Sequence, residues 1–119
     1  MYKTIKIAGK DYPVNFGTWA IRCFEEETKT FIANMVHSEK PTSDGMALIY
    51  HGIKDGHRVA KLPFTLSQAE LADVLDEDTN PKTITDIMNV FREQQGIPNM
   101  EDVDEKNLKA PAKKKKIGA

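Results

Sequence analysis

Three histidines, together with nearby carboxylates such as Asp44 and Asp55, are the side chains in this 119-residue chain whose chemistry suits a metal ion. Imidazole and carboxylate ligands are typical of zinc and iron sites. A metal-binding helix places two ligands four residues apart on one face, but His51 falls inside a predicted helix and His57 follows a predicted helix end. We therefore expect no metal or other cofactor, and expect His37, His51 and His57 to be exposed loop residues, with His51 partly packed.

Cys23 is the only cysteine, so the chain cannot form an internal disulfide. A nucleophilic cysteine needs a histidine and an electropositive setting that favour the thiolate. The acidic run Glu25–Glu27 that follows Cys23 disfavours the thiolate. The sequence therefore predicts a buried structural cysteine beside Trp19 and Phe24.

Other patterns of catalytic sites are missing from the sequence. Four carboxylates near the end of a predicted helix lack the alternating spacing and the glycine of a calcium loop, and are expected to be solvated: Asp73, Asp76, Glu77 and Asp78. We find no glycine-rich phosphate loop, no Ser-His-Asp arrangement and no paired carboxylates in an apolar setting. We therefore expect a binding protein and not an enzyme.

Charge is divided unevenly along the chain. Residues 1–100 carry 11 basic and 14 acidic side chains, whereas residues 101–119 carry 6 basic and 4 acidic ones. A mildly acidic body disfavours a specific nucleic-acid surface, which needs clustered basic side chains. No apolar run approaches the roughly 20 residues of a membrane span, and the start of the chain does not resemble a secretory signal. We expect a cytosolic protein that does not enter a membrane.

The elements that must position a binding surface begin with a β-hairpin. Two extended segments, 2–7 and 12–16, flank the turn-type sequence Ala8-Gly9-Lys10-Asp11. In the second segment Tyr12, Val14 and Phe16 share one face, which we expect to cover helices.

Helical periodicity dominates the rest of the first hundred residues. Ser67 and Glu70 form a predicted capping box, with Leu66 and Leu71 at the spacing of a hydrophobic staple, and Gly96 is a predicted C-terminal cap. The apolar spacing restarts after Lys29-Thr30 over 31–36, before a linker over 37–44. The expected helices span about 18–28, 43–54 (ended by Asp55-Gly56), 67–75 and 80–96, the last with Asn80 as cap and Pro81 at its first position.

We predict an α+β fold: an N-terminal two-stranded β-hairpin followed by about four α-helices packed as a small bundle. The domain should span residues 1–97. Residues 98–119 should form a flexible charged tail that ends in a lysine run, because high charge and few apolar residues do not support a packed core.

Several of these segments, in this order, resemble the tail assembly chaperones of long-tailed bacteriophages. The similar pieces are Gly9-Lys10-Asp11-Tyr12, Phe16-Gly17, Phe24-Glu25-Glu26-Glu27-Thr28, Ala47-Leu48-Ile49-Tyr50-His51-Gly52-Ile53-Lys54, Thr65-Leu66 and Asn80-Pro81. The resemblance covers residues 2–96 and is weakest from Met35 to Gly45.

The resemblance implies a chaperone that binds and solubilises the tape measure protein and helps recruit tail tube subunits. Such a protein acts in the host cell cytoplasm, is absent from the mature virion and can self-associate. It implies no catalytic residues and no cofactor. Family members are often made in two lengths by programmed frameshifting, and this chain resembles the short form.

Six large apolar side chains are candidates for the partner-binding surface, although each also suits a core position: Trp19, Phe31, Met35, Met46, Phe64 and Met88. An amphipathic helix binds by laying its apolar face in a groove, and methionine adapts to many partner sequences.

The tail contains a run of four lysines, Lys113, Lys114, Lys115 and Lys116. This run has three interpretations. Four ammonium groups can bind phosphates non-specifically, which would make the chain a small nucleic-acid-associated or regulatory interaction module that acts through its basic tail. They can simply solubilise the tail. Alternatively, four lysine codons can create an A-rich heptamer on which a ribosome slips, which the resemblance implies near the end of the short chaperone form. A minor virion component is a further alternative.

Overall fold

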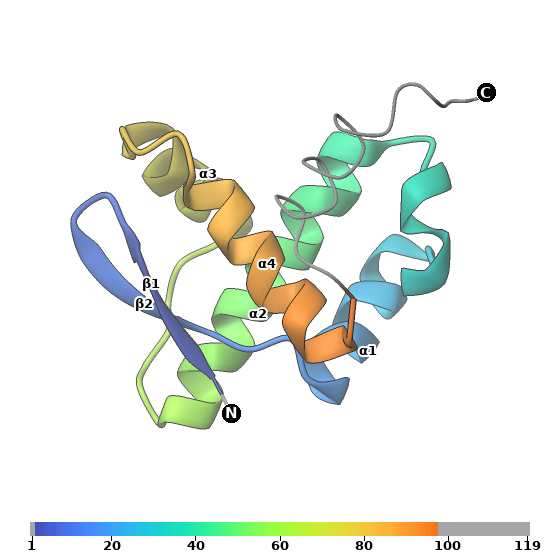
Figure 1. Ribbon diagram of the computed structural model, residues 1–119, viewed down its shortest axis with the longest axis horizontal. Helices are drawn as coiled ribbons and strands as arrows, with labels where there is room; N and C mark the ends of the chain where they lie inside the picture. Colours follow the sequence, from blue (N-terminus) through green and yellow to red (C-terminus); the bar gives the residue numbers. More distant parts are fainter. Residues whose placement is uncertain (1, 98–119) are drawn as a thin grey trace, which may run out of the picture.

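The computed structural model describes residues 2–97 and has a hairpin followed by helices, as predicted. Figure 1 shows the hairpin at one side, α2 through the middle, and α1 on the opposite side. The predicted tail, residues 98–119, lies outside the described residues. In chain order the elements are β1 (Lys3–Ile7), β2 (Lys10–Val14), α1 (Thr18–Thr28), the 3-10 helix η1 (Ile32–His37), α2 (Pro41–Ala60), α3 (Gln68–Glu77) and α4 (Thr83–Gln95).

The hairpin has a two-residue turn. Strands β1 and β2 pair in antiparallel register, with Lys3 opposite Val14 and Ile7 opposite Lys10. The turn residues Ala8 and Gly9 have φ values of 51° and 82°, as a type I′ turn requires at both of its central positions. The inner face of β2 is buried as predicted, and the hairpin therefore closes one side of the helical core.

Helix α2 is longer than predicted. It extends for 20 residues from Pro41 to Ala60, so the prediction that Asp55-Gly56 ends it was wrong. The reason is packing. Gly52 and Gly56 lie on one face of α2, against β2 and the residues that follow it. A Cβ at Gly52 would lie 2.2 Å from the Phe16 ring, and one at Gly56 would lie 2.2 Å from the Pro13 carbonyl oxygen.

The connection between β2 and α1 is held from two helices. The Asn15 N–H donates to the Gly52 carbonyl of α2 at 2.9 Å. From α4, the Gln94 amide oxygen accepts the Phe16 N–H at 2.6 Å, and its nitrogen donates to Asn15 Oδ1 at 2.9 Å. These bonds fix the point at which the chain enters α1.

The segment between α1 and α2 is more ordered than the predicted linker. Lys29 ends α1 in the left-handed conformation. The apolar spacing that restarts over 31–36 then forms the 3-10 helix η1. Helix α2 begins at Pro41, earlier than predicted, with proline at a first-turn position where no N–H is required. Only Ser38 to Lys40 separate the two helices.

The capping predictions for α3 and α4 were partly correct. The Ser67 hydroxyl accepts the Glu70 N–H and the Glu70 carboxylate accepts the Ser67 N–H, which confirms the capping box. Gly96, with φ of 75°, confirms the predicted cap of α4. Asn80 does not cap α4, which begins at Thr83. Its side chain instead accepts the Lys82 N–H at 3.0 Å in the preceding turn.

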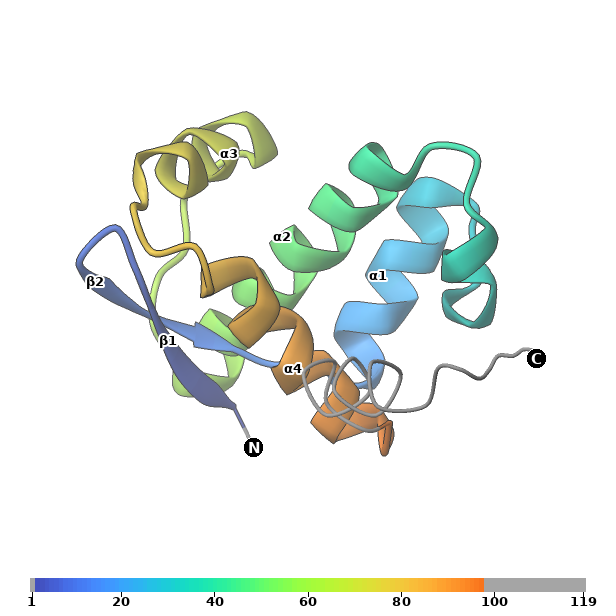
Figure 2. The same cartoon turned by 45° about the horizontal axis from the view of Figure 1, so that its top comes forward.

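The core lies between the hairpin and helices α1, α2 and α4, with α3 contributing Leu71 (Figure 2). Helix α2 contributes most, because it contacts β2 and each of the other α-helices. The buried core side chains are Ile7, Tyr12, Val14, Phe16, Phe24, Ala47, Leu48, Ile49, Ile53, Leu71, Ile87 and Val90.

Candidate functional site

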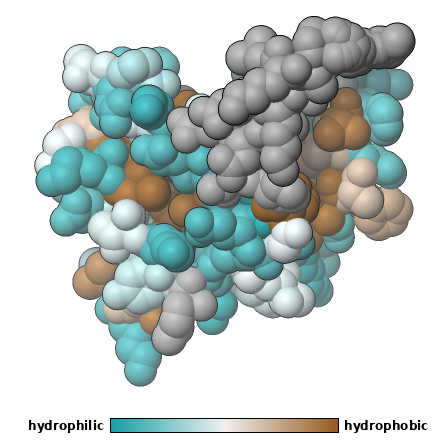
Figure 3. Space-filling view, in the orientation of Figure 1, coloured by the Kyte–Doolittle hydropathy of each residue, from teal (hydrophilic) through white to brown (hydrophobic). Residues whose placement is uncertain are grey.

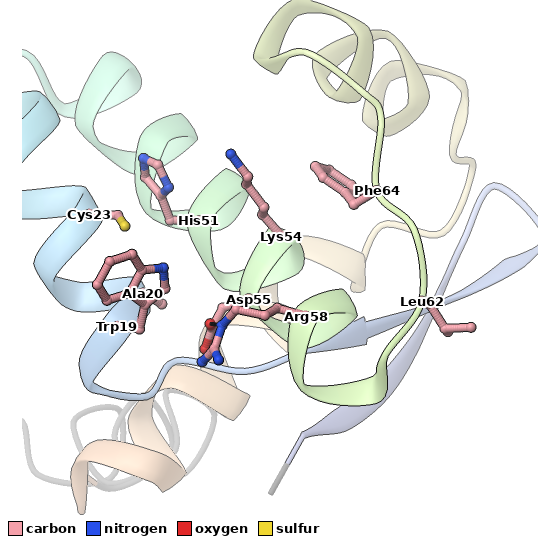
Figure 4. A pocket seen from close by; sticks show the side chains of 9 residues that line it. All are labelled: Trp19, Ala20, Cys23, His51, Lys54, Asp55, Arg58, Leu62 and Phe64. Carbon is pink, nitrogen blue, oxygen red and sulfur yellow. Dashed lines mark hydrogen bonds and ion pairs between the residues drawn. The ribbon is translucent and has the colours of Figure 1, made fainter.

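The first candidate surface is a pocket of about 340 Å³ between α1, the second half of α2 and the segment after α2. We call it the tryptophan pocket (Figure 4). Trp19 is 49% exposed and forms one side, and Phe64 forms the opposite side. Lys54 and Arg58 add positive charge. The lining residues are Trp19, Ala20, Cys23, His51, Lys54, Asp55, Arg58, Leu62 and Phe64.

The carboxylate of Asp55 is the buried polar group of this pocket. Its Oδ2 accepts a hydrogen bond from Asn15 Nδ2 at 2.8 Å, and its Oδ1 accepts one from Arg58 Nε at 2.6 Å. The side chain is only 2% exposed. Because both oxygens have partners, Asp55 positions α2 against the β2–α1 connection and orients Arg58 at the pocket.

Cys23 and His51 occupy the α1–α2 side of the same pocket. The prediction of a buried Cys23 was wrong, because the residue is only partly buried and lines the pocket. His51 is partly packed as predicted, and its Nε2 lies 2.7 Å from Glu27 Oε1. Partial burial would raise the pKa of Glu27, but hydrogen bonds from His51 and Gln68 outweigh it and lower that pKa. This arrangement gives His51 a carboxylate partner on α1.

His57 is not an exposed loop residue, so that prediction was wrong. It lies in the last turns of α2 and is 9% exposed. Its Nδ1 donates to the Ile53 carbonyl at 2.7 Å, and its ring packs on Phe64 at a centroid distance of 4.8 Å. The error follows from the predicted end of α2. Because α2 continues to Ala60, His57 lies within it and packs against Phe64. His37, at the end of η1, is exposed as predicted.

Two carboxylates, Asp78 and Asp44, organise the fold. Asp78 accepts hydrogen bonds from the Thr83 hydroxyl and the Ala8 N–H, and these bonds lower its pKa. The predicted solvated position of Asp78 was therefore wrong. Asp44 is fully buried and accepts from Lys40, Ser38 and Thr30. Within residues 2–97, no three His, Cys, Asp or Glu side chains are placed to hold a metal ion.

The second candidate surface is an apolar groove of about 510 Å³ between η1 and α4, which we call the methionine groove. Apolar side chains gather over η1 at the right of Figure 3. Val36 is 85% exposed and Ile97 is 46% exposed. The groove is lined by Ile32, Ala33, Met35, Val36, Leu48, Met88, Phe91, Arg92, Gln95 and Ile97.

The six candidate binding residues fall in different places. Trp19 and Phe64 line the tryptophan pocket, and Met35 and Met88 line the methionine groove. Phe31 is 68% exposed just before η1 and lines neither surface.

Met46 is also outside both surfaces and packs partly buried against the core. Sequence reasoning missed Phe91 and Val36 as groove residues. The helical spacing of Ile87, Met88 and Phe91 in the sequence was a signal for Phe91. These residues are divided between the core and the groove. No local signal shows which side a residue such as Phe91 faces.

No protein-family model, curated protein or solved structure matches this chain, so the comparisons indicate no family. Among residues 2–97, none of the helices has the length and apolar character needed to cross a bilayer.

Proposed function

We propose that the protein is a bacteriophage tail assembly chaperone that binds and solubilises the tape measure protein and helps recruit tail tube subunits. The sequence resemblance over residues 2–96 motivates this proposal. It also implies action in the host cell cytoplasm, self-association along the partner and absence from the mature virion.

The observation that carries the proposal is the methionine groove. Its apolar lining includes two methionines, and the adjoining η1 segment exposes Phe31 and Val36 to solvent. Large apolar side chains in a concave surface are suited to the apolar face of an amphipathic helix. Methionine side chains adapt their shape to different partner sequences, as a chaperone that binds many sites along one long polypeptide requires.

The tryptophan pocket supplies a second contact of different character. Trp19 and Phe64 offer aromatic surface, and Lys54 and Arg58 lie beside them. A partner segment that combines apolar and acidic side chains would suit it. Two weak contacts on one small domain, repeated over many copies, would hold a long partner by avidity.

Co-expression with the tape measure protein encoded nearby tests the proposal. The soluble fraction of the tape measure should rise with the wild-type chain and with Ile84→Asp, but not with Val36→Asp. Both replaced side chains are exposed, and only Val36 lines the groove. A tape measure that is equally soluble without this chain would contradict the proposal.

Two further measurements address the finer points. The nucleotide sequence should contain an A-rich heptamer at codons 113–116 and an overlapping downstream frame; without these, the frameshift part fails. Mass spectrometry of purified particles should not detect the chain, and its presence there would instead favour a virion component.

A further inference from the structure

The methionine groove contains one charged side chain without a complete set of partners. Arg92 Nη1 is buried and has no hydrogen-bond partner among residues 2–97. Arg92 is also the only charged residue of the described chain that lines the groove. A buried guanidinium nitrogen without an acceptor is costly, and a carboxylate is the acceptor that fits it best.

The chain leaves the described domain at this same groove. Gly96 ends α4 in the left-handed conformation, and the Ile97 N–H donates to the Arg92 carbonyl at 2.7 Å. Ile97 itself lines the groove. Ile97, the last described residue, therefore lies at the groove beside Arg92.

The sequence that follows has the chemistry that the groove requires. Apolar side chains alternate with carboxylates over the next eleven residues: Met100, Val103 and Leu108 are apolar, and Glu101, Asp102, Asp104 and Glu105 are acidic. A residue advances the chain by at most about 3.5 Å, so Glu101 reaches up to about 14 Å from Ile97 and Glu105 up to about 28 Å. All four carboxylates can therefore return to Arg92.

We propose that residues 98–108 bind in cis to the methionine groove, with an acidic side chain of the segment paired to Arg92 and its apolar side chains against Met35 and Met88. The covalent connection gives the segment an effective concentration on the order of millimolar. A contact too weak to be seen with a separate peptide is then sufficient for occupancy.

Paramagnetic relaxation in the full-length chain tests the contact. A nitroxide is attached in the Cys23→Ser/Asn107→Cys variant, and methionine and leucine methyl groups are observed by NMR. The Met35 and Met88 methyl signals should broaden much more than those of Leu62, which lines the tryptophan pocket. Equal broadening at all three residues would overturn the proposal.

Two variants of the labelled chain distinguish an ion pair with Arg92 from proximity that results only from the covalent connection. Neutralising the segment (E101Q/D102N/D104N/E105Q) or replacing Arg92→Gln should reduce the broadening at Met35 and Met88 toward that at Leu62. Unchanged broadening in both variants would exclude the ion pair. Circular dichroism of each variant checks that the domain remains folded.

A second copy of the chain is the other possible occupant of the groove. To test for it, chains that carry only the nitroxide are mixed with chains that carry only the isotope label. If the methyl signals broaden as much in this mixture as when one chain carries both labels, the segment of a second copy occupies the groove and the cis contact is overturned. The experiment contains no tape measure protein, so its failure and failure of the chaperone proposal are separate results.

Discussion

Gly56 lies against the backbone of Pro13 so closely that a Cβ at position 56 would stand 2.2 Å from the Pro13 carbonyl oxygen. Backbone atoms of the strand cannot move aside without breaking the register of the hairpin. The glycine that sequence reasoning interpreted as a helix end is therefore the residue that lets α2 pass under β2.

We expect Gly52→Ala and Gly56→Ala to destabilise the protein, although alanine favours a helix by about 1 kcal/mol. Overpacking of this kind costs about 1–3 kcal/mol, and Gly56→Ala should cost more because its neighbour is backbone. Gly45→Ala, in the same helix with nothing within 4 Å of the added Cβ, is the matched control and should stabilise. Urea unfolding midpoints measure all three; equal shifts at the three positions would contradict this account of α2.

Asp44 should make stability depend on acid pH. The hydrogen bond from the Lys40 ammonium, at 2.6 Å, and then that from the Ser38 hydroxyl lower the pKa of Asp44. Its contribution is therefore complete above the pKa of an unfolded aspartate, about 3.9, and is lost as pH falls through the lower folded value.

Urea midpoints measured from neutral pH down to about pH 3 should fall for the wild type. They should fall less steeply for Asp44→Asn, which keeps the shape but not the charge. Parallel curves for the two proteins would show that Asp44 does not control this dependence.

The turn residue Ala8 offers a stabilising substitution. It adopts φ of 51°, which asparagine tolerates better than alanine, and Asn-Gly is the preferred pair of a type I′ turn. Ala8→Asn should raise stability by up to about 1 kcal/mol and retain the N–H donated to Asp78. Ala8→Val should lower stability, because a β-branched side chain resists this conformation. Thermal unfolding compares them, and the same melting temperature for both would exclude strain at this turn.

Removal of the Ser67 cap should destabilise α3. The Ser67 hydroxyl accepts the Glu70 N–H at 3.1 Å, so Ser67→Ala leaves that group without its partner. The expected loss is about 1 kcal/mol. Thr65→Ala, two residues earlier and also exposed, is the control. Hydrogen exchange of the α3 amides provides the measurement, and equal exchange in the two variants would count against the cap.

Nucleic-acid binding, if it occurs, should depend on the lysine run. Each phosphate contact contributes a slope of about −0.9 in a plot of log affinity against log salt. Replacing Lys113–Lys116 with glutamine should therefore remove the salt slope together with the binding to a DNA duplex. Binding that survives this change would exclude the alternative in which the chain binds nucleic acid through its basic tail.

The sequence by itself determined the hairpin, the capping box of α3, the separate helical segment after α1 and the end of α4. Each of these depends on hydrogen bonds or backbone angles within a few residues, such as the pair Ser67 and Glu70 or the glycine at position 96. Local chemistry of this kind is visible in the order of residues.

Only the tertiary structure decided the length of α2, the burial of His57 and the roles of Asp44 and Asp78. These features depend on how separate elements pack, as when Asp78 accepts the N–H of Ala8 and Asp44 accepts the hydroxyl of Thr30 on the other side of η1. The same holds for the binding surfaces, where Met35 and Met88 line one groove and Trp19 lies across a pocket from Phe64 (Figure 4). Apolar spacing marks a residue as suited to burial, but the packing of other elements decides whether it is covered or left open to a partner.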